Sequence, residues 1–247
     1  MKLKLTTALA AGLLALSLPV MAQDTTEATE ATEGTPAWNE AGGEQDEALS
    51  LIPDHENGIY TFEVCSACHQ LNGWGLPDGT FPQLAGQHVN VIIKQLSDIR
   101  AQNRDNPTMY PFALPSEIGG SQSIMDVAAY ISKLPMNPEN GVGPGTDLEL
   151  GAKLYADNCV RCHGDSGEGN DEKFYPRIHG QHYNYLVRQF AWIRDGKRRN
   201  ANPEMVEQIA GFTDAEMDAV LDYVSRIDPP ADMVATDPNW SNPDYDW

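Results

Sequence analysis

Cys65-Ser66-Ala67-Cys68-His69 decides the fold of this 247-residue chain, together with a second copy of the same pattern, Cys159-Val160-Arg161-Cys162-His163. C-x-x-C-H is the pattern to which c-type haem is attached. The two thiols bond to the haem vinyl groups, and the adjacent imidazole binds the iron. One such motif alone also suits part of a zinc site or a redox dithiol. All four cysteines of the chain belong to the two copies, which favours two covalent haems.

The chain begins with a stretch typical of a secretory signal. Lys2 and Lys4 precede an apolar run, and Val20-Met21-Ala22 has the small residues of a cleavage site. The run is short for a membrane span, although an uncleaved anchor is the alternative. We therefore expect residues 1–22 to be a signal peptide and the remaining chain to be exported and periplasmic, because c-type haem is attached beyond the cytoplasmic membrane.

Residues 23–53 carry eight acidic side chains and no basic ones. Repeated Thr, Glu and Ala with few large apolar residues cannot form a hydrophobic core, so we expect a disordered tether. A helix is the alternative, but the segment lacks an apolar stripe. The whole chain has a net charge of −20, which disfavours nucleic acid and anionic membrane surfaces as partners because they would repel it.

The rest of the chain contains an internal duplication with a constant offset of 94 residues, seen in residues 65 and 159. Residues 81–100 align with residues 175–194 and are identical at eight of the twenty positions. Pro and Gly between the two copies indicate a linker. We expect a first haem domain at 54–134, a linker at 135–146, a second domain at 147–228 and an acidic, aromatic tail at 229–247.

Apolar residues recur with helical spacing at matching places in both repeats. The first pair of stripes spans 89–99 and 183–193, and the second pair spans 124–134 and 217–227. Thr213-Asp-Ala-Glu216 is a capping box for the last helix. Shorter helices are expected before the motifs, at 55–64 and 148–158. No stretch alternates as a strand does, so we predict an all-α fold of two tandem helical bundles, each around a covalent haem that adds to a small core.

The residue on the second side of each iron decides what the haem can do. Met109 and Met205 each follow a repeated Asn-Pro pair and lie about forty residues after the haem histidine, in a loop between two long helices. We predict that His69 and Met109 bind one iron and that His163 and Met205 bind the other. A Met ligand raises the reduction potential relative to bis-His ligation. With both axial positions filled, neither iron is open to a substrate.

Other ligand choices remain open. Met125 and Met217 lie within helical stripes, where methionine is usually core filling. His88 and His182 are repeated and would give bis-His ligation, but each opens a helix, where a polar residue is common.

Two further features bear on the surroundings of the haems. Pro82 and Pro176 occupy equivalent turns, where a carbonyl suits the second ring N–H of the haem histidine, although a plain turn role is the alternative. The run Lys197-Arg198-Arg199 beside Met205 is either a contact for a partner or a haem propionate, or a solvated basic surface.

Taken together, the duplicated C-x-x-C-H, the repeated F/Y-P-x-L/I-x-G-Q-H block and the Met segment before a final helix resemble the dihaem cytochrome c4 family. The resemblance covers about residues 54–228. It implies two class I cytochrome c folds related by a pseudo-twofold axis, with haem propionates near their interface. It also implies a periplasmic carrier of single electrons between respiratory proteins, for example to a terminal oxidase. The acidic leader and the tail depart from the family pattern.

Two other functions remain as alternatives. The chain could be the cytochrome subunit of a dehydrogenase complex, such as a flavocytochrome c sulfide dehydrogenase, or a haem peroxidase, which needs an open iron. We expect redox proteins as electron donor and acceptor, loose association with a membrane oxidase, no small-molecule substrate and no enzyme activity of the chain itself.

Overall fold

The computed structural model describes residues 42–245, so the predicted signal peptide and most of the predicted leader lie outside the described residues. Helices account for the regular structure of this part. Between residues 42 and 245 the extended pairing is limited to isolated bridges, Met136 with Val234 and Asn170 with Tyr175. No helix in the described part has the length and apolar character needed to span a bilayer.

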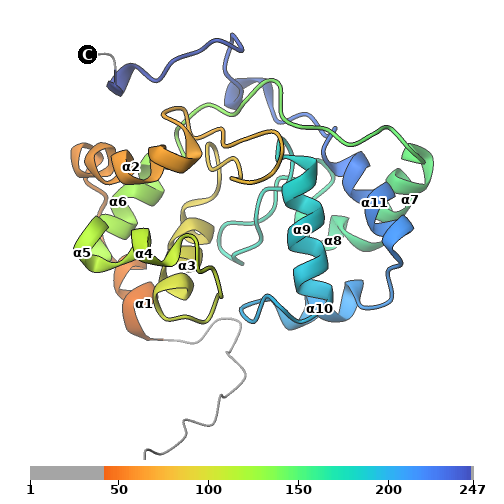
Figure 1. Ribbon diagram of the computed structural model, residues 1–247, viewed down its shortest axis with the longest axis horizontal. Helices are drawn as coiled ribbons and strands as arrows, with labels where there is room; N and C mark the ends of the chain where they lie inside the picture. Colours follow the sequence, from red (N-terminus) through yellow and green to blue (C-terminus); the bar gives the residue numbers. More distant parts are fainter. Residues whose placement is uncertain (1–41, 246–247) are drawn as a thin grey trace, which may run out of the picture. The chain divides into compact units, whose positions relative to one another are not determined.

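Each repeat forms its own group of helices, and Figure 1 shows the two groups beside each other. The first repeat forms α2 (His55–His69), α3 (Val89–Arg100), α4 (Tyr110–Ala113), α5 (Pro115–Ile118) and α6 (Ser121–Ile131). The second forms α7 (Leu148–Asn158), α8 (Val160–His163), α9 (Tyr183–Arg194), α10 (Pro203–Ile209) and α11 (Asp214–Val224). The all-α prediction and both pairs of helical stripes are confirmed, and the capping box of α11 is present.

The helix before each motif packs closely on the last long helix of its repeat, α2 on α6 and α7 on α11. Glycine permits this approach. A Cβ added to Gly58 would lie 2.6 Å from the carbonyl oxygen of Asp126, and one added to Gly151 would clash with that of Ala219. Any larger residue would force these helices apart and move the motif that follows.

The first haem motif lies inside a helix, which corrects the predicted helix end at residue 64. Helix α2 begins after Asp54, whose side chain accepts hydrogen bonds from the N–H groups of Glu56 and Asn57, and it continues to His69. The three-residue spacing of the cysteines places both sulfurs on one face of such a helix, so the motif prolongs the helix rather than following it. In the second repeat α7 ends where predicted and α8 carries the motif's last residues.

The prediction of a disordered leader over 23–53 is wrong for its last part, because α1 (Gly43–Leu49) is a packed helix. It contacts α3 and α6. Ala48 is completely buried, and Glu44 pairs with Arg100 of α3. The acidic side chains that suggested a solvated tether therefore include two with specific partners, since Glu47 also accepts from the Ser121 hydroxyl. Ala48, with Leu49 and Leu51 packed partly buried against the same core, takes the place of the missing stripe.

The C-terminal tail returns from the second repeat to the first, as the dark blue trace in Figure 1 shows. Its backbone pairs with the linker, where Met136 donates to the carbonyl of Met233 at 2.7 Å. Further along, Trp240 packs on Trp74 with ring centroids 6.1 Å apart. Tyr245 is buried, and its hydroxyl donates to the Ile59 carbonyl at 2.6 Å. The tail thus forms part of the first repeat's core.

Candidate haem sites

One continuous cavity of about 620 Å³ reaches into both repeats. Much of its wall is apolar and comes from helices α3 and α9, the first pair of predicted stripes. All eight residues predicted to hold the haems line it: Cys65, Cys68, His69 and Met109 from the first repeat, and Cys159, Cys162, His163 and Met205 from the second.

Both haem histidines are oriented by a proline carbonyl, as the sequence suggested. His69 Nδ1 lies 2.9 Å from the Pro82 oxygen, and His163 Nδ1 lies 3.1 Å from the Pro176 oxygen. Since a carbonyl only accepts, each Nδ1 carries the proton and each Nε2 keeps its lone pair for a metal. Burial lowers the pKa of both rings, which favours the neutral form that binds metals.

Two of the four cysteines lie where burial disfavours a free thiolate. Burial raises the pKa of Cys65 and of Cys159 to about 12. A zinc site or a redox dithiol needs ionised thiols, whereas a thioether to haem does not. Within residues 42–245, no cluster of three or more His, Cys, Asp or Glu side chains could hold a metal ion. The donor set and the apolar wall therefore suit haem better than zinc.

The two predicted methionine ligands reach the cavity from different local structures. Met109 lies in a turn before α4, and its N–H donates to the Asn106 carbonyl at 3.1 Å. Met205, which we predicted in a loop, lies instead in the first turn of α10. Asn202 caps this helix and Pro203 occupies its first turn, where a missing N–H costs nothing. The pair Asn202-Pro203, which we had interpreted as part of a loop, begins helix α10.

The alternative methionines and histidines lie elsewhere. Met125 and Met217 are buried in the helical cores and do not line the cavity. His88 and His182 contact the opposite repeat. His88 Nε2 lies 2.8 Å from the carbonyl oxygen of residue 168, and His182 Nε2 lies 2.7 Å from that of Trp74. Residues 74 and 168 are equivalent by the offset of 94, so these contacts are a symmetric pair that joins the repeats.

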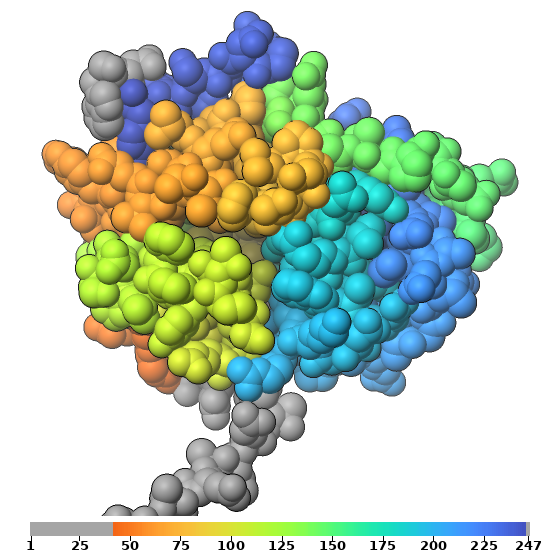
Figure 2. Space-filling view, in the orientation of Figure 1, coloured from red at the N-terminus to blue at the C-terminus, as the bar shows by residue number. Residues whose placement is uncertain are grey.

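The glutamine before each of these histidines forms a second symmetric pair. Gln181 accepts from the N–H of Gln83 at 3.0 Å and donates to its carbonyl at 2.9 Å. Gln87 makes the equivalent bonds to Arg177, at 2.9 and 3.0 Å. Sequence reasoning missed this role of Gly-Gln-His, although the exact repetition of the three residues was a signal. The repeated block therefore builds the interface between the repeats, shown as a seam in Figure 2.

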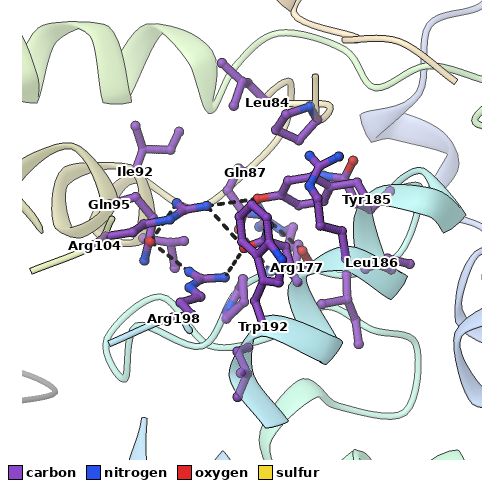
Figure 3. Close-up of a pocket in the computed structure, with 18 of the residues that line it drawn as sticks. Leu84, Gln87, Ile92, Gln95, Arg104, Arg177, Tyr185, Leu186, Trp192 and Arg198 are labelled. Carbon is purple, nitrogen blue, oxygen red and sulfur yellow. Dashed lines mark hydrogen bonds between the residues drawn. The ribbon is translucent and has the colours of Figure 1, made fainter. Parts of the chain in front are cut away.

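A third symmetric contact lies deeper in the cavity (Figure 3). Arg104 donates to Gln95 Oε1 at 2.9 Å and to Gln189 Oε1 at 3.3 Å. Arg198 donates to Gln189 Oε1 at 2.9 Å and to Gln95 Oε1 at 2.8 Å. Each guanidinium thus spans both repeats, and we call Arg104 and Arg198 the crossed pair. Arg198, the middle residue of the basic run 197–199, therefore lines the cavity, whereas Lys197 and Arg199 are exposed.

Comparison with known proteins agrees with this architecture. A Cytochrome c family profile matches residues 148–228. Cytochrome c4 of Azotobacter vinelandii is 31% identical over 180 residues, which are 66% of this chain and 84% of that protein. The thiosulfate dehydrogenase electron acceptor of Stutzerimonas stutzeri (strain A1501) is 33% identical over 175 residues, covering 66% of this chain and 79% of that protein.

Among solved structures, the crystal structure of reduced recombinant cytochrome c4 from Pseudomonas stutzeri aligns with a TM-score of 0.60 at 29% identity, over 70% of this chain and 98% of that one. Two covalently bound c-type haems are therefore the cofactors, one for each C-x-x-C-H motif. The protein transfers electrons and is not itself an enzyme. By sequence and by structure, this chain belongs to the cytochrome c4 family.

Proposed function

We propose that the protein carries single electrons between redox proteins of the periplasm. His69 and Met109 are the proposed axial ligands of one iron, and His163 and Met205 those of the other. The thioether bonds come from the paired cysteines of each motif, within domains at 54–134 and 147–228. The observation that carries the proposal is that each motif and its methionine line the same cavity.

Bound haem supplies reversible one-electron chemistry at iron. The chain supplies the control of that chemistry. The carbonyls of Pro82 and Pro176 hold the histidine rings in one tautomer and one orientation, in which each Nε2 would be available to bind iron. The apolar residues of α3 and α9 that line the cavity would limit the access of water to the haems. With two protein ligands on each iron, no position remains for a substrate such as peroxide.

The electron donor and acceptor are proposed by class. A relative named as the electron acceptor of a thiosulfate dehydrogenase supports a dehydrogenase as the donor. We propose a membrane-bound terminal oxidase as the acceptor, reached by loose association. The same relative also supports a second role, in which the chain is the cytochrome subunit of a dehydrogenase complex. Co-purification of a stoichiometric dehydrogenase would favour this second role.

An optical redox titration of ligand variants tests the proposed iron ligands. In Met109→His and in Met205→His we expect one reduction step to move to lower potential, because imidazole stabilises ferric iron more than a thioether does. Both haems should stay attached, and the weak long-wavelength Met–iron band should fall. Met125→Leu and Met217→Leu are the controls and should leave both steps in place. Unchanged steps in the histidine variants would refute the assignment.

A further inference from the structure

The crossed pair is a concentration of positive charge that lacks a carboxylate partner in the described part of this acidic chain, whose net charge is −20. Neither Arg104 nor Arg198 belongs to an ion pair formed among residues 42–245. Asp98 lies near Arg198, but its carboxylate accepts bonds from Lys94 and Asn200, each at 2.7 Å. The glutamine oxygens satisfy N–H groups of both guanidiniums without neutralising them.

The electrostatics of the neighbourhood point the same way. Burial, and then the proximity of Arg104, lower the pKa of Arg198 to about 9, so it is still charged at neutral pH. The Tyr185 hydroxyl lies 3.4 Å from Arg104. Burial acts to raise the pKa of this phenol, but Arg104 and Arg198 outweigh it and the pKa is lowered. The site is therefore built to stabilise negative charge.

Both guanidiniums are partly buried, and two like charges held together in such a place are costly unless an anion joins them. Both guanidiniums line the cavity that holds the two cysteine motifs, and Figure 3 shows them converging there with Gln95 between them. The anionic groups that haem brings into such a cavity are its propionate carboxylates. Guanidinium binds carboxylate with paired, charge-assisted hydrogen bonds.

We propose that the crossed pair binds propionate groups of both haems and acts as a shared electrostatic bridge that raises both reduction potentials together. This inference rests on the proposed function, since it requires two haems with filled axial positions. A nearby cation favours the reduced iron, which carries one positive charge less. Because each guanidinium is bonded to a glutamine of each repeat, neither cation belongs to one haem alone.

The test is an optical redox titration of two variants of the full dihaem protein, Arg104→Gln and Arg198→Gln. We expect both reduction steps to fall in each single variant, by about tenfold in each reduction equilibrium constant, or about 59 mV per one-electron step. Arg194→Gln is the matched control. It removes the same charge from α9, but Arg194 pairs with Asp195 and Asp214. Both steps should stay in place in this control.

A shift of one step alone, or of neither, overturns the proposal. If the arginines only join the repeats, the variants will unfold at lower urea concentration with unchanged potentials. If a glutamine variant loses a haem, Arg104→Met and Arg198→Met replace it, because methionine also removes the charge and adapts to irregular packing. Both reduction steps should fall in these variants too. Failure of the ligand assignment gives a different result, since the Met–iron band would then be missing from the unmodified protein.

Discussion

Helices α2 and α7 occupy equivalent places before their motifs, yet their surroundings differ. Phe62 of α2 corresponds to Ala156 of α7 at the offset of 94. Phe62 is completely buried, with ring centroids 5.4 Å from Tyr130 and 6.4 Å from Tyr245 of the tail. Ala156 is exposed. A large apolar residue thus occurs where the tail covers the helix, and a small one where the helix faces solvent.

The same contrast extends to the whole core of each repeat. The buried cluster of the first repeat includes Ala48 from α1, and Ala235 and Tyr245 from the tail. The buried cluster of the second repeat draws on its own helices. Among the described residues the first cluster is clearly the larger. We therefore expect haem to make up a larger share of the second core, because that repeat buries fewer apolar residues of its own.

The largest effect should come from removing the haem attachment of one repeat. In Cys159→Ser with Cys162→Ser we expect half the haem content and loss of hydrogen-exchange protection throughout α7 to α11. In Cys65→Ser with Cys68→Ser we expect the same haem loss but residual protection in α2 and α6, which α1 and the tail still cover. Haem assay and hydrogen exchange measure both. Equal loss of protection in both variants would contradict the comparison.

Exchanging the paired residues of α2 and α7 tests the role of the tail. Phe62→Ala leaves a cavity between α2, Tyr130 and Tyr245 and should cost about 3–5 kcal/mol of unfolding free energy. Ala156→Phe adds an apolar side chain to an exposed position and should change the unfolding free energy by less than about 0.5 kcal/mol. Urea unfolding followed by circular dichroism measures both. A comparable loss in the two variants would mean that the tail does not create the difference.

The interface histidines should make stability depend on pH, and unequally. Burial lowers the pKa of both His182, which is completely buried, and His88, which is half-buried. Their stabilisation is complete above the unfolded pKa of about 6.5 and is lost as the pH falls toward the depressed folded pKa. Protonating His182 also breaks the 3.0 Å bond that its Nδ1 accepts from the Gly141 N–H.

We therefore expect the urea midpoint of the unmodified protein to decrease when the pH is lowered from about 7.5 to about 5.5, the range in which an ordinary histidine titrates. His182 also faces the Trp74 carbonyl, the Gly141 N–H and the carboxylate of Asp78. The negative charge of Asp78 favours the protonated ring, so it acts against the lowering of the His182 pKa by burial. His182→Gln should remove more of this pH dependence than His88→Gln. A larger loss of pH dependence in His88→Gln than in His182→Gln would show that burial is not the reason why the two histidines contribute unequally.

The smallest effects concern the caps of the two equivalent helices α6 and α11. Thr213 caps α11 with a full capping box, whereas Gly120 gives α6 no side-chain cap. Thr213→Ala should cost about 1 kcal/mol, and Gly120→Ser should stabilise by a few tenths of a kcal/mol. A Cβ at Gly120 meets no atom within 4 Å. Thermal unfolding compares the variants, and a destabilised Gly120→Ser would argue against the capping difference.

Much of the fold was predictable because its signals are local. The stripe at 89–99 and its copy at 183–193 were correctly assigned to helices, since 3.6-residue periodicity depends on neighbours within one turn. Helix α1 was missed because it is held by contacts with α3 and α6, among them Arg100 more than fifty residues away, and not by a pattern of its own. His88 and His182 were open as ligands because spacing alone does not say which surface a side chain meets.

The sequence by itself determined the number of haem motifs, the helical composition and the residues that we propose as iron ligands. These follow from covalent spacing and from periodicity within single helices. Only the tertiary structure decided that Gly-Gln-His joins the repeats, that Arg104 and Arg198 share both sides of one cavity, and that the tail covers the first repeat. Each of these depends on which of several compatible surfaces meet, and contacts between residues far apart in the sequence decide that choice.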